Sequence, residues 1–115
     1  MMLGAMASGN DSVERFDSDT NRVPLVTIVP KYPAVARRDR IQGEVQVCFN
    51  ITREGHPRRI AVRSSNNRLF EKPAMKAVRK STWVRLDDDK EISGIKACRT
   101  FRFSLVAVDN DGDQS

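Results

Sequence analysis

The chain has few of the residues on which most enzyme and metal sites depend. Its 115 residues include one histidine and two cysteines. A structural zinc site takes about four ligands at close spacing, so this set makes a poor zinc site. The sequence has no glycine-rich phosphate loop, and no stretch approaches the roughly 18 apolar residues of a membrane-spanning helix. We therefore expect no metal and no cofactor.

Two features come closest to a catalytic or metal-binding site, and both are better explained as solvated loops. His56 lies in an expected hairpin turn and lacks an obvious nucleophile or orienting partner. The side chains of Asp87, Asp88 and Asp89 are consecutive in a polar loop, so they diverge rather than converge on a cation. The chain is predicted not to be an enzyme.

Acidic residues are outnumbered, with 15 Asp and Glu against 20 Lys and Arg and a net charge of +5. This excess is compatible with nucleic acid, an anionic surface or an acidic protein as partner, and equally with a basic domain that binds none of them. Hydrophobic residues make up 39% of the chain, enough for one small domain with a modest core.

The two ends of the chain are polar and read as disordered segments. We interpret residues 1–21 as a disordered leader left from cloning, because they lack the basic and apolar regions of a secretion signal. Residues 108–115 are predicted to be a disordered tail. The single folded domain is expected to span residues 22–107.

The first half of this domain is predicted to run from an extended lead-in to a hairpin. The lead-in, residues 22–33, contains three prolines, which limit strand pairing but leave room for a short edge strand at 25–29. A helix of about two turns follows Pro33. Residues 43–52 then alternate between apolar and polar side chains, and Gly55 favours a tight turn into a return strand at 58–65.

The second half is predicted to contain a helix and a third strand. Apolar residues at helical spacing from Phe70 to Ser81 make one face, and residues 95–106 alternate again. A right-handed crossover places the third strand beside the first. The expected fold is therefore α+β: a two-layer, three-stranded antiparallel sheet in the order 2-1-3, with two helices on one face. Its third strand is an exposed edge.

The two cysteines fall on the same face of neighbouring strands in this topology. A register that sets Cys48 opposite Cys98 also sets Val45 opposite Phe101. A cross-strand disulfide in an oxidising compartment is therefore the favoured interpretation. The alternative is two unrelated thiols in a reducing cell.

The stretch "YPAVARRDRIQGEVQVCFNITREGHPRRIAVRSS" followed by "FEKPAMKAVRKSTW" resembles the C-terminal domain of TonB energy transducers. The resemblance covers roughly residues 28–106 and rests on an ordered set of positions, namely Tyr32, Pro33, Arg40, Ile41, Gly43, Gly55, Phe70, Ala77 and Trp83. The sequence departs from the family pattern at Val35, where some members carry a cation near this position, and at Ser81, where a tryptophan is more usual. The cysteine pair is not general in the family.

The resemblance implies a periplasmic domain of a protein anchored in the inner membrane and driven by a complex of the ExbB–ExbD type. Such a domain binds the TonB box, a short extended peptide of a TonB-dependent outer-membrane transporter, and drives uptake of iron chelates, haem or cobalamin. An exposed edge strand suits this task, because an extended peptide can add to it as a further strand.

Two groups of residues are predicted to bind the partner. Residues of the third strand would flank the added peptide: Lys96, Thr100, Arg102 and Ser104. Residues around the Tyr-Pro segment would contact an acidic or polar transporter surface: Tyr32, Pro33, Arg37, Arg38 and Arg40. The alternatives are that Tyr32 and Pro33 pack as a lid over the sheet and that the arginines form a solvated helix face.

Other partners are also considered. A TolA-like or other envelope domain would use the same strand addition, and exposed sheet edges also allow a homodimer. A small basic nucleic-acid-binding domain is not expected, because Phe49, Phe101 and Phe103 alternate inward and would not form a stacking platform.

Overall fold

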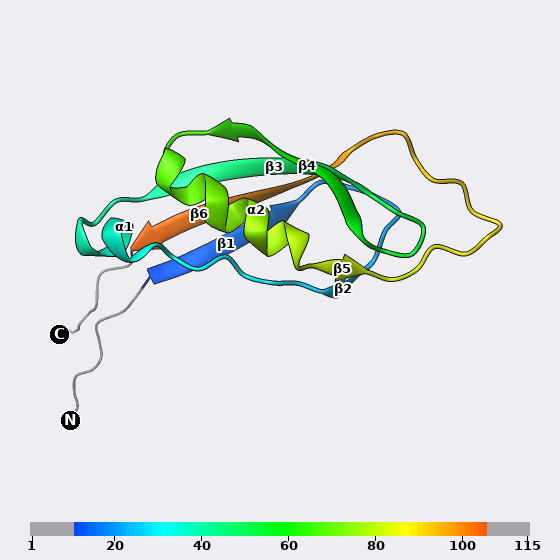
Figure 1. Cartoon of the computed structure of the whole chain (residues 1–115), viewed down its shortest axis with the longest axis horizontal. Helices are drawn as coiled ribbons and strands as arrows, with labels where there is room; N and C mark the ends of the chain where they lie inside the picture. Colours follow the sequence, from blue (N-terminus) through cyan, green and yellow to red (C-terminus); the bar gives the residue numbers. More distant parts are fainter. Residues whose placement is uncertain (1–10, 106–115) are drawn as a thin grey trace, which may run out of the picture.

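The computed structural model describes residues 11–105, which form a four-stranded antiparallel sheet in the order β1-β6-β3-β4 and a separate pair, β2-β5 (Figure 1). The elements are β1 (Asp11–Asp17), β2 (Pro24–Val26), α1 (Ala34–Arg38), β3 (Gly43–Ile51), β4 (Pro57–Ser65), the 3₁₀ turn η1 (Arg68–Phe70), α2 (Glu71–Arg79), β5 (Thr82–Trp83) and β6 (Ala97–Leu105). The α+β prediction is confirmed.

Strand β3 is central because its alternation gives it one fully buried face. Val45, Val47 and Phe49 are buried on the side that faces the core. The hairpin to β4 turns at Gly55, whose φ of +100° lies in the left-handed region. A Cβ there would also lie 1.9 Å from the carbonyl oxygen of Trp83, so no side chain fits this position.

The predicted 2-1-3 order holds within the sheet, because β3 lies between β4 and β6. The predicted register also holds, with Val45 opposite Phe101 and Cys48 opposite Cys98. The two cysteines form a disulfide that joins β3 to β6. The cross-strand pairing derived from the alternation is therefore confirmed.

The sheet has a fourth strand that the sequence analysis missed. Residues 11–17, assigned above to a disordered leader, pair with β6 over seven residues, from Asp11 opposite Leu105 to Asp17 opposite Arg99. The prediction that the third strand is an exposed edge is therefore wrong. A segment this polar shows no strand signal by itself, and its partners on β6 supply the pairing. Residues 1–10 and the predicted tail at 108–115 lie outside the described residues.

Helix α2 crosses one face of the sheet, as predicted (Figure 1). Asn67 caps the preceding 3₁₀ turn, its side chain accepting a hydrogen bond of 2.9 Å from the Leu69 N–H. Phe70 then stacks on Phe103 of β6, with ring centroids 4.4 Å apart. Helix α1 lies at the end of the sheet rather than across its face, and its Ala36 joins the same core.

Two boundaries differ from the prediction. The lead-in strand is β2, at 24–26 rather than 25–29, and it pairs with β5, where no strand was predicted. The third strand begins at Ala97 rather than 95, and Ile95 is 83% exposed in the preceding loop. Within residues 11–105, no helix is long and apolar enough to cross a membrane.

Replacing both cysteines with serine should lower the free energy of unfolding by about 2–4 kcal/mol, because the disulfide closes a long loop in the unfolded chain. The bonded residues are 50 apart in sequence. Urea denaturation of the Cys48→Ser, Cys98→Ser variant against the oxidised protein measures the difference. The reduced wild-type protein should match the variant, and an unchanged midpoint would contradict a stabilising role.

Candidate functional site

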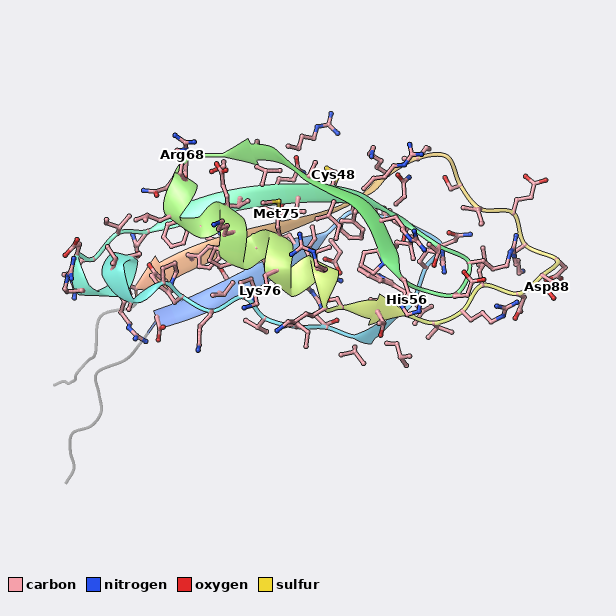
Figure 2. The ribbon with its side chains drawn as sticks, in the orientation of Figure 1. Cys48, His56, Arg68, Met75, Lys76 and Asp88 are labelled. Atoms are coloured by element: carbon pink, nitrogen blue, oxygen red, sulfur yellow. A yellow bond between two sulfur atoms is a disulfide. The ribbon has the colours of Figure 1, made fainter. Side chains whose placement is uncertain are left out.

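The candidate catalytic and metal-binding residues do not converge. His56 is exposed near the turn between β3 and β4, and Asp88 lies out on the long loop before β6 (Figure 2). Across residues 11–105, no group of three or more histidine, cysteine or acidic side chains could hold a metal ion. The features that remain are a sheet edge and a basic groove.

The first feature is the side of β6 that faces β1, which we name the β6 edge. It binds an extended segment of the same chain along its whole length. The pairing continues past β1, because the Ser18 N–H donates to the Cys98 carbonyl oxygen over 2.9 Å and the Ser18 hydroxyl accepts from the Cys98 N–H over 2.9 Å. The β6 edge is therefore able to accept a strand.

The residues predicted to flank an added strand do lie along this edge. Thr100 is opposite Phe16 of β1, and Ser104 is opposite Ser12. Arg102 is exposed, and its guanidinium lies 5.0 Å from the centroid of the Phe16 ring. Lys96 comes just before β6, and its ammonium donates to the Asn50 side-chain oxygen over 3.4 Å. These four residues lie on or just before β6, and their role in binding a partner stays a prediction.

Arg102 also takes part in a small charge network across three strands. Its guanidinium lies 3.7 Å from a Glu14 carboxylate oxygen on β1 and 3.6 Å from a Glu44 carboxylate oxygen on β3. All three side chains are about half exposed, so water screens these pairs and each contributes little to stability. The network orients Arg102 along the β6 edge without locking it.

Arg99 is the residue at this edge that sequence reasoning missed. It occupies an inward position of β6 and is 1% exposed. Its Nε donates to one Asp17 carboxylate oxygen over 2.7 Å and its Nη2 to the other over 3.1 Å. The guanidinium also lies 5.1 Å from the centroid of the Trp83 ring. The available signal was an arginine among apolar residues at alternating positions of the strand.

Strand β1 is held mainly by its backbone and by charged residues at its two ends. Val13 is its one side chain that packs against the hydrophobic core. At one end Asp17 pairs with Arg99, and at the other the Asp11 carboxylate lies 3.4 Å from the Arg37 guanidinium of α1. Since little apolar area is buried, the hydrophobic effect stabilises β1 only weakly.

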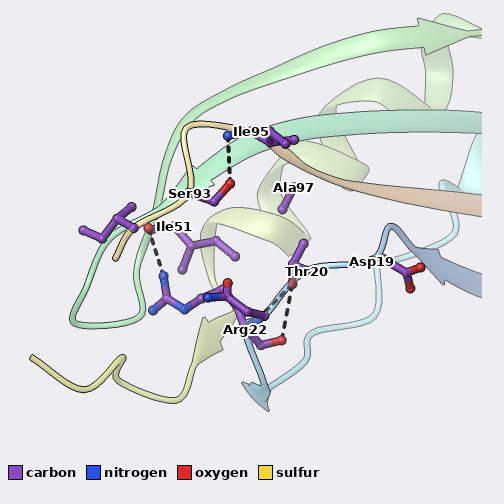
Figure 3. Close-up of a pocket in the computed structure, with 9 residues that line it drawn as sticks. Asp19, Thr20, Arg22, Ile51, Ser93, Ile95 and Ala97 are labelled. Atoms are coloured by element: carbon purple, nitrogen blue, oxygen red, sulfur yellow. Dashed lines mark hydrogen bonds between the residues drawn. The ribbon is translucent and has the colours of Figure 1, made fainter. Parts of the chain in front are cut away.

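The segment after β1 is fixed by Arg22. Its Nη1 donates to the Ile51 carbonyl oxygen over 3.1 Å and its Nη2 to the Thr52 carbonyl oxygen over 2.7 Å, beside a pocket of about 250 Å³ (Figure 3). Burial, and secondarily the charge of Arg53, lowers the pKa of Arg22. We name these contacts the Arg22 clamp, and they tie the chain to the end of β3.

The second feature is a groove of about 730 Å³ between the lead-in and α2. Its cations come from three elements, and we name it the basic groove: Lys31, Arg37, Lys72, Lys76 and Lys80. Lys76 projects from α2 in Figure 2. Three of these cations recur every four residues, at Lys72, Lys76 and Lys80, a spacing that places them on one side of a helix.

The predicted Tyr-Pro group separates into two sets in the structure. Pro33 and Arg37 line the basic groove, and Tyr32 forms part of its wall. Arg38 instead pairs with its neighbour Asp39 over 3.0 Å, and Arg40 is exposed in a left-handed conformation with φ of +58°. Neither Arg38 nor Arg40 lines the groove.

Tyr32 packs as a lid over the sheet, as the alternative interpretation held. It is 6% exposed, and its ring makes edge-to-face contacts with Phe70 and Phe103. Its hydroxyl donates to the Ile41 carbonyl oxygen over 2.5 Å. Burial, and secondarily the nearby Asp11 carboxylate, raises the pKa of Tyr32 above its ordinary value of 10.0.

The raised pKa of Tyr32 predicts a loss of stability above about pH 10. There the unfolded chain loses the phenolic proton while the folded protein keeps it, so unfolding becomes easier as the pH rises. Tyr32 is the one tyrosine in the sequence, so tyrosinate absorbance reports it alone. Its titration should fall at higher pH in the folded protein than in denaturant, and coincident titrations would contradict the prediction. Tyr32→Phe is the control, with a cost of about 1 kcal/mol for the lost hydrogen bond.

Comparison with known proteins agrees with this geometry. Residues 29–105 match the family described as Gram-negative bacterial TonB protein C-terminal. The solution NMR structure of the Pseudomonas aeruginosa TonB C-terminal domain is similar, at 30% identity and a TM-score of 0.55 over 76% of this chain and 89% of that one. The comparison with curated protein sequences yields no match.

The family match covers α1, β3, β4, α2, β5 and β6, and it leaves β1 and β2 outside. Three strands of the sheet, β4, β3 and β6, lie within the matched residues, and β1 pairs with β6 from outside that range. The chain belongs to the family of TonB C-terminal domains, which are non-enzymatic transducer domains of TonB-type energy transduction and are typically periplasmic.

Proposed function

We propose that this domain binds the TonB box of outer-membrane transporters by strand addition at the β6 edge and transmits inner-membrane energy to them. The observation that carries the proposal is the pairing of β1 with β6. An extended seven-residue segment of this chain already pairs with β6, which supports the proposal that this edge can take up an extended peptide. A TonB box is an extended peptide that would use the same backbone groups.

The bonds that join the strands of the sheet suit a domain that works under tension. A peptide added to β6 would be held by a row of main-chain hydrogen bonds, and β6 is bonded covalently to the central strand β3 through Cys48 and Cys98. The disulfide therefore opposes separation of the loaded strand from the sheet. An extracytoplasmic compartment is also where such a bond persists.

The basic groove supplies a second contact for the partner. Its rim carries cations from the lead-in, α1 and α2, and Pro33 and Arg37 belong to it. We propose that an acidic or polar surface of the transporter meets this groove while the TonB box pairs with β6. Electrostatic attraction of this kind speeds encounter and orients the partner more than it adds affinity.

The remaining parts of the proposed function follow from the family. The domain would be the periplasmic part of a protein anchored in the inner membrane and driven by an ExbB–ExbD type complex. Its transporters would take up iron chelates, haem or cobalamin. Nucleic-acid binding has no support, because Phe49, Phe101 and Phe103 are all buried at 1% exposure or less.

A synthetic TonB-box peptide should shift the amide signals of β6 in a nitrogen–proton NMR titration of the oxidised domain. Main-chain pairing changes the environment of each amide along the strand. The largest shifts are expected at 97–105 and in β1, with smaller ones around the basic groove. The matched control is the same peptide with a central residue replaced by proline, which cannot donate to the ladder and should bind weakly.

Two results would contradict the proposal. No shifts at millimolar peptide would remove the transporter as the partner of this domain. Shifts confined to β4, the opposite edge of the sheet, would place the peptide elsewhere. Equal binding of the proline peptide would also show that the sheet is not extended by backbone pairing.

A further inference from the structure

The pairing of Arg99 with Asp17 makes the β6 edge chemically selective. Arg99 is a buried cation whose two hydrogen bonds to carboxylate both come from β1. A partner strand that takes the place of β1 removes Asp17 from Arg99. The guanidinium would then stay buried against Trp83 without an anionic partner, which is unfavourable.

We propose that β1 is a displaceable placeholder on the β6 edge, and that the partner strand which replaces it brings a carboxylate to Arg99. This inference rests on the proposed function, and it adds the chemistry that the edge selects. The partner is an extended peptide with an acidic residue at one fixed position. That position is the one opposite Arg99, which Asp17 holds in the closed arrangement.

Strand β1 is easy to displace because few buried contacts hold its side chains. Of its seven side chains, Val13 is the one that joins the hydrophobic core. In the ion pair of Asp11 with Arg37, the arginine side chain is 52% exposed, and the Asp17 side chain is 31% exposed although Arg99 is not. The Arg22 clamp holds the chain just beyond β1, so β1 can leave while the following segment keeps its place.

The surroundings of Arg99 favour a carboxylate over other groups. Asp17 binds it through both oxygens, the paired geometry that a planar guanidinium prefers. Its Nη1 is buried and has no hydrogen-bond partner among the described residues. A cavity of about 220 Å³ borders Arg99, Asp17 and Trp83. An incoming acidic side chain therefore has room to approach and a donor that β1 leaves unused.

The test is a positional scan with synthetic peptides. Each probe has the length of β1, alternates threonine and valine, ends in a glycine–lysine tail for solubility, and carries one aspartate at a different position. A second series carries asparagine at the same positions. Binding to the oxidised domain is followed by the NMR signals of β6 and β1. At one position, aspartate should bind about tenfold more tightly than asparagine, because a charge-assisted pair with Arg99 is gained.

Two pairs of variants separate Arg99 from general electrostatics. Arg99→Gln should abolish the aspartate preference, while Arg63→Gln, an exposed arginine on β4 at the opposite edge of the sheet, should keep it. Asp17→Asn should tighten the favoured peptide by about three- to tenfold, because β1 then competes less well. Glu14→Gln, on the exposed face of β1, should change binding less than about twofold. If Arg99→Gln does not fold, the peptide scan on the wild type and the comparison of Asp17→Asn with Glu14→Gln still test the carboxylate requirement.

The outcomes distinguish this inference from the proposed function. If a TonB-box peptide and both series bind at β6 with no preference for aspartate, the carboxylate requirement is wrong and the proposed function stands. If β1 keeps its native amide signals at saturation, displacement is wrong. If no peptide binds either the wild type or Asp17→Asn, the proposed function fails and this inference fails with it.

Discussion

The pairing of β3 with β6 is the interaction on which the rest of the structure depends. These two strands occupy the middle of the sheet, share the disulfide, and contribute most of the large apolar side chains beneath α2. The hairpin partner β4 lies on one side of this pair and β1 on the other. The Tyr32 lid and Phe70 both pack against Phe103 of β6, so the lead-in and α2 are positioned by the same strand.

Much of this arrangement could be predicted because regular alternation carries the information. The apolar phase of β3 and of β6 determined which side chains face inward, and the cysteine positions then gave the register. The crossover rule gave the correct neighbour for β6. The turn at Gly55 and the helix beginning near Phe70 likewise followed from local signals.

The rest could not be predicted because its stabilising contacts are not local. Strand β1 is polar and has no periodic apolar signal, and it becomes a strand through partners more than 80 residues away, such as Arg99 for Asp17. The residues of the candidate site likewise include some that the sequence predicts and one that it does not. Residues flanking β6 were found by their phase, whereas the role of Arg99 depends on Trp83 and Asp17, which lie near it only in the folded chain.

The antiparallel pairing of β1 with β6 fixes the order in which their hydrogen bonds break when β1 is pulled from its N-terminal end. Its pairs run from Asp11 opposite Leu105 to Asp17 opposite Arg99, and the Arg22 clamp follows. A pull applied ahead of Asp11 and away from the sheet breaks these pairs one at a time, ending with Asp17 at Arg99 and then the contacts of Ser18 with Cys98. Peeling of this kind takes less force than shearing all pairs together, and it stops where Arg22 is anchored. Tension could thus uncover the strand that a partner needs while leaving the core of the domain unloaded.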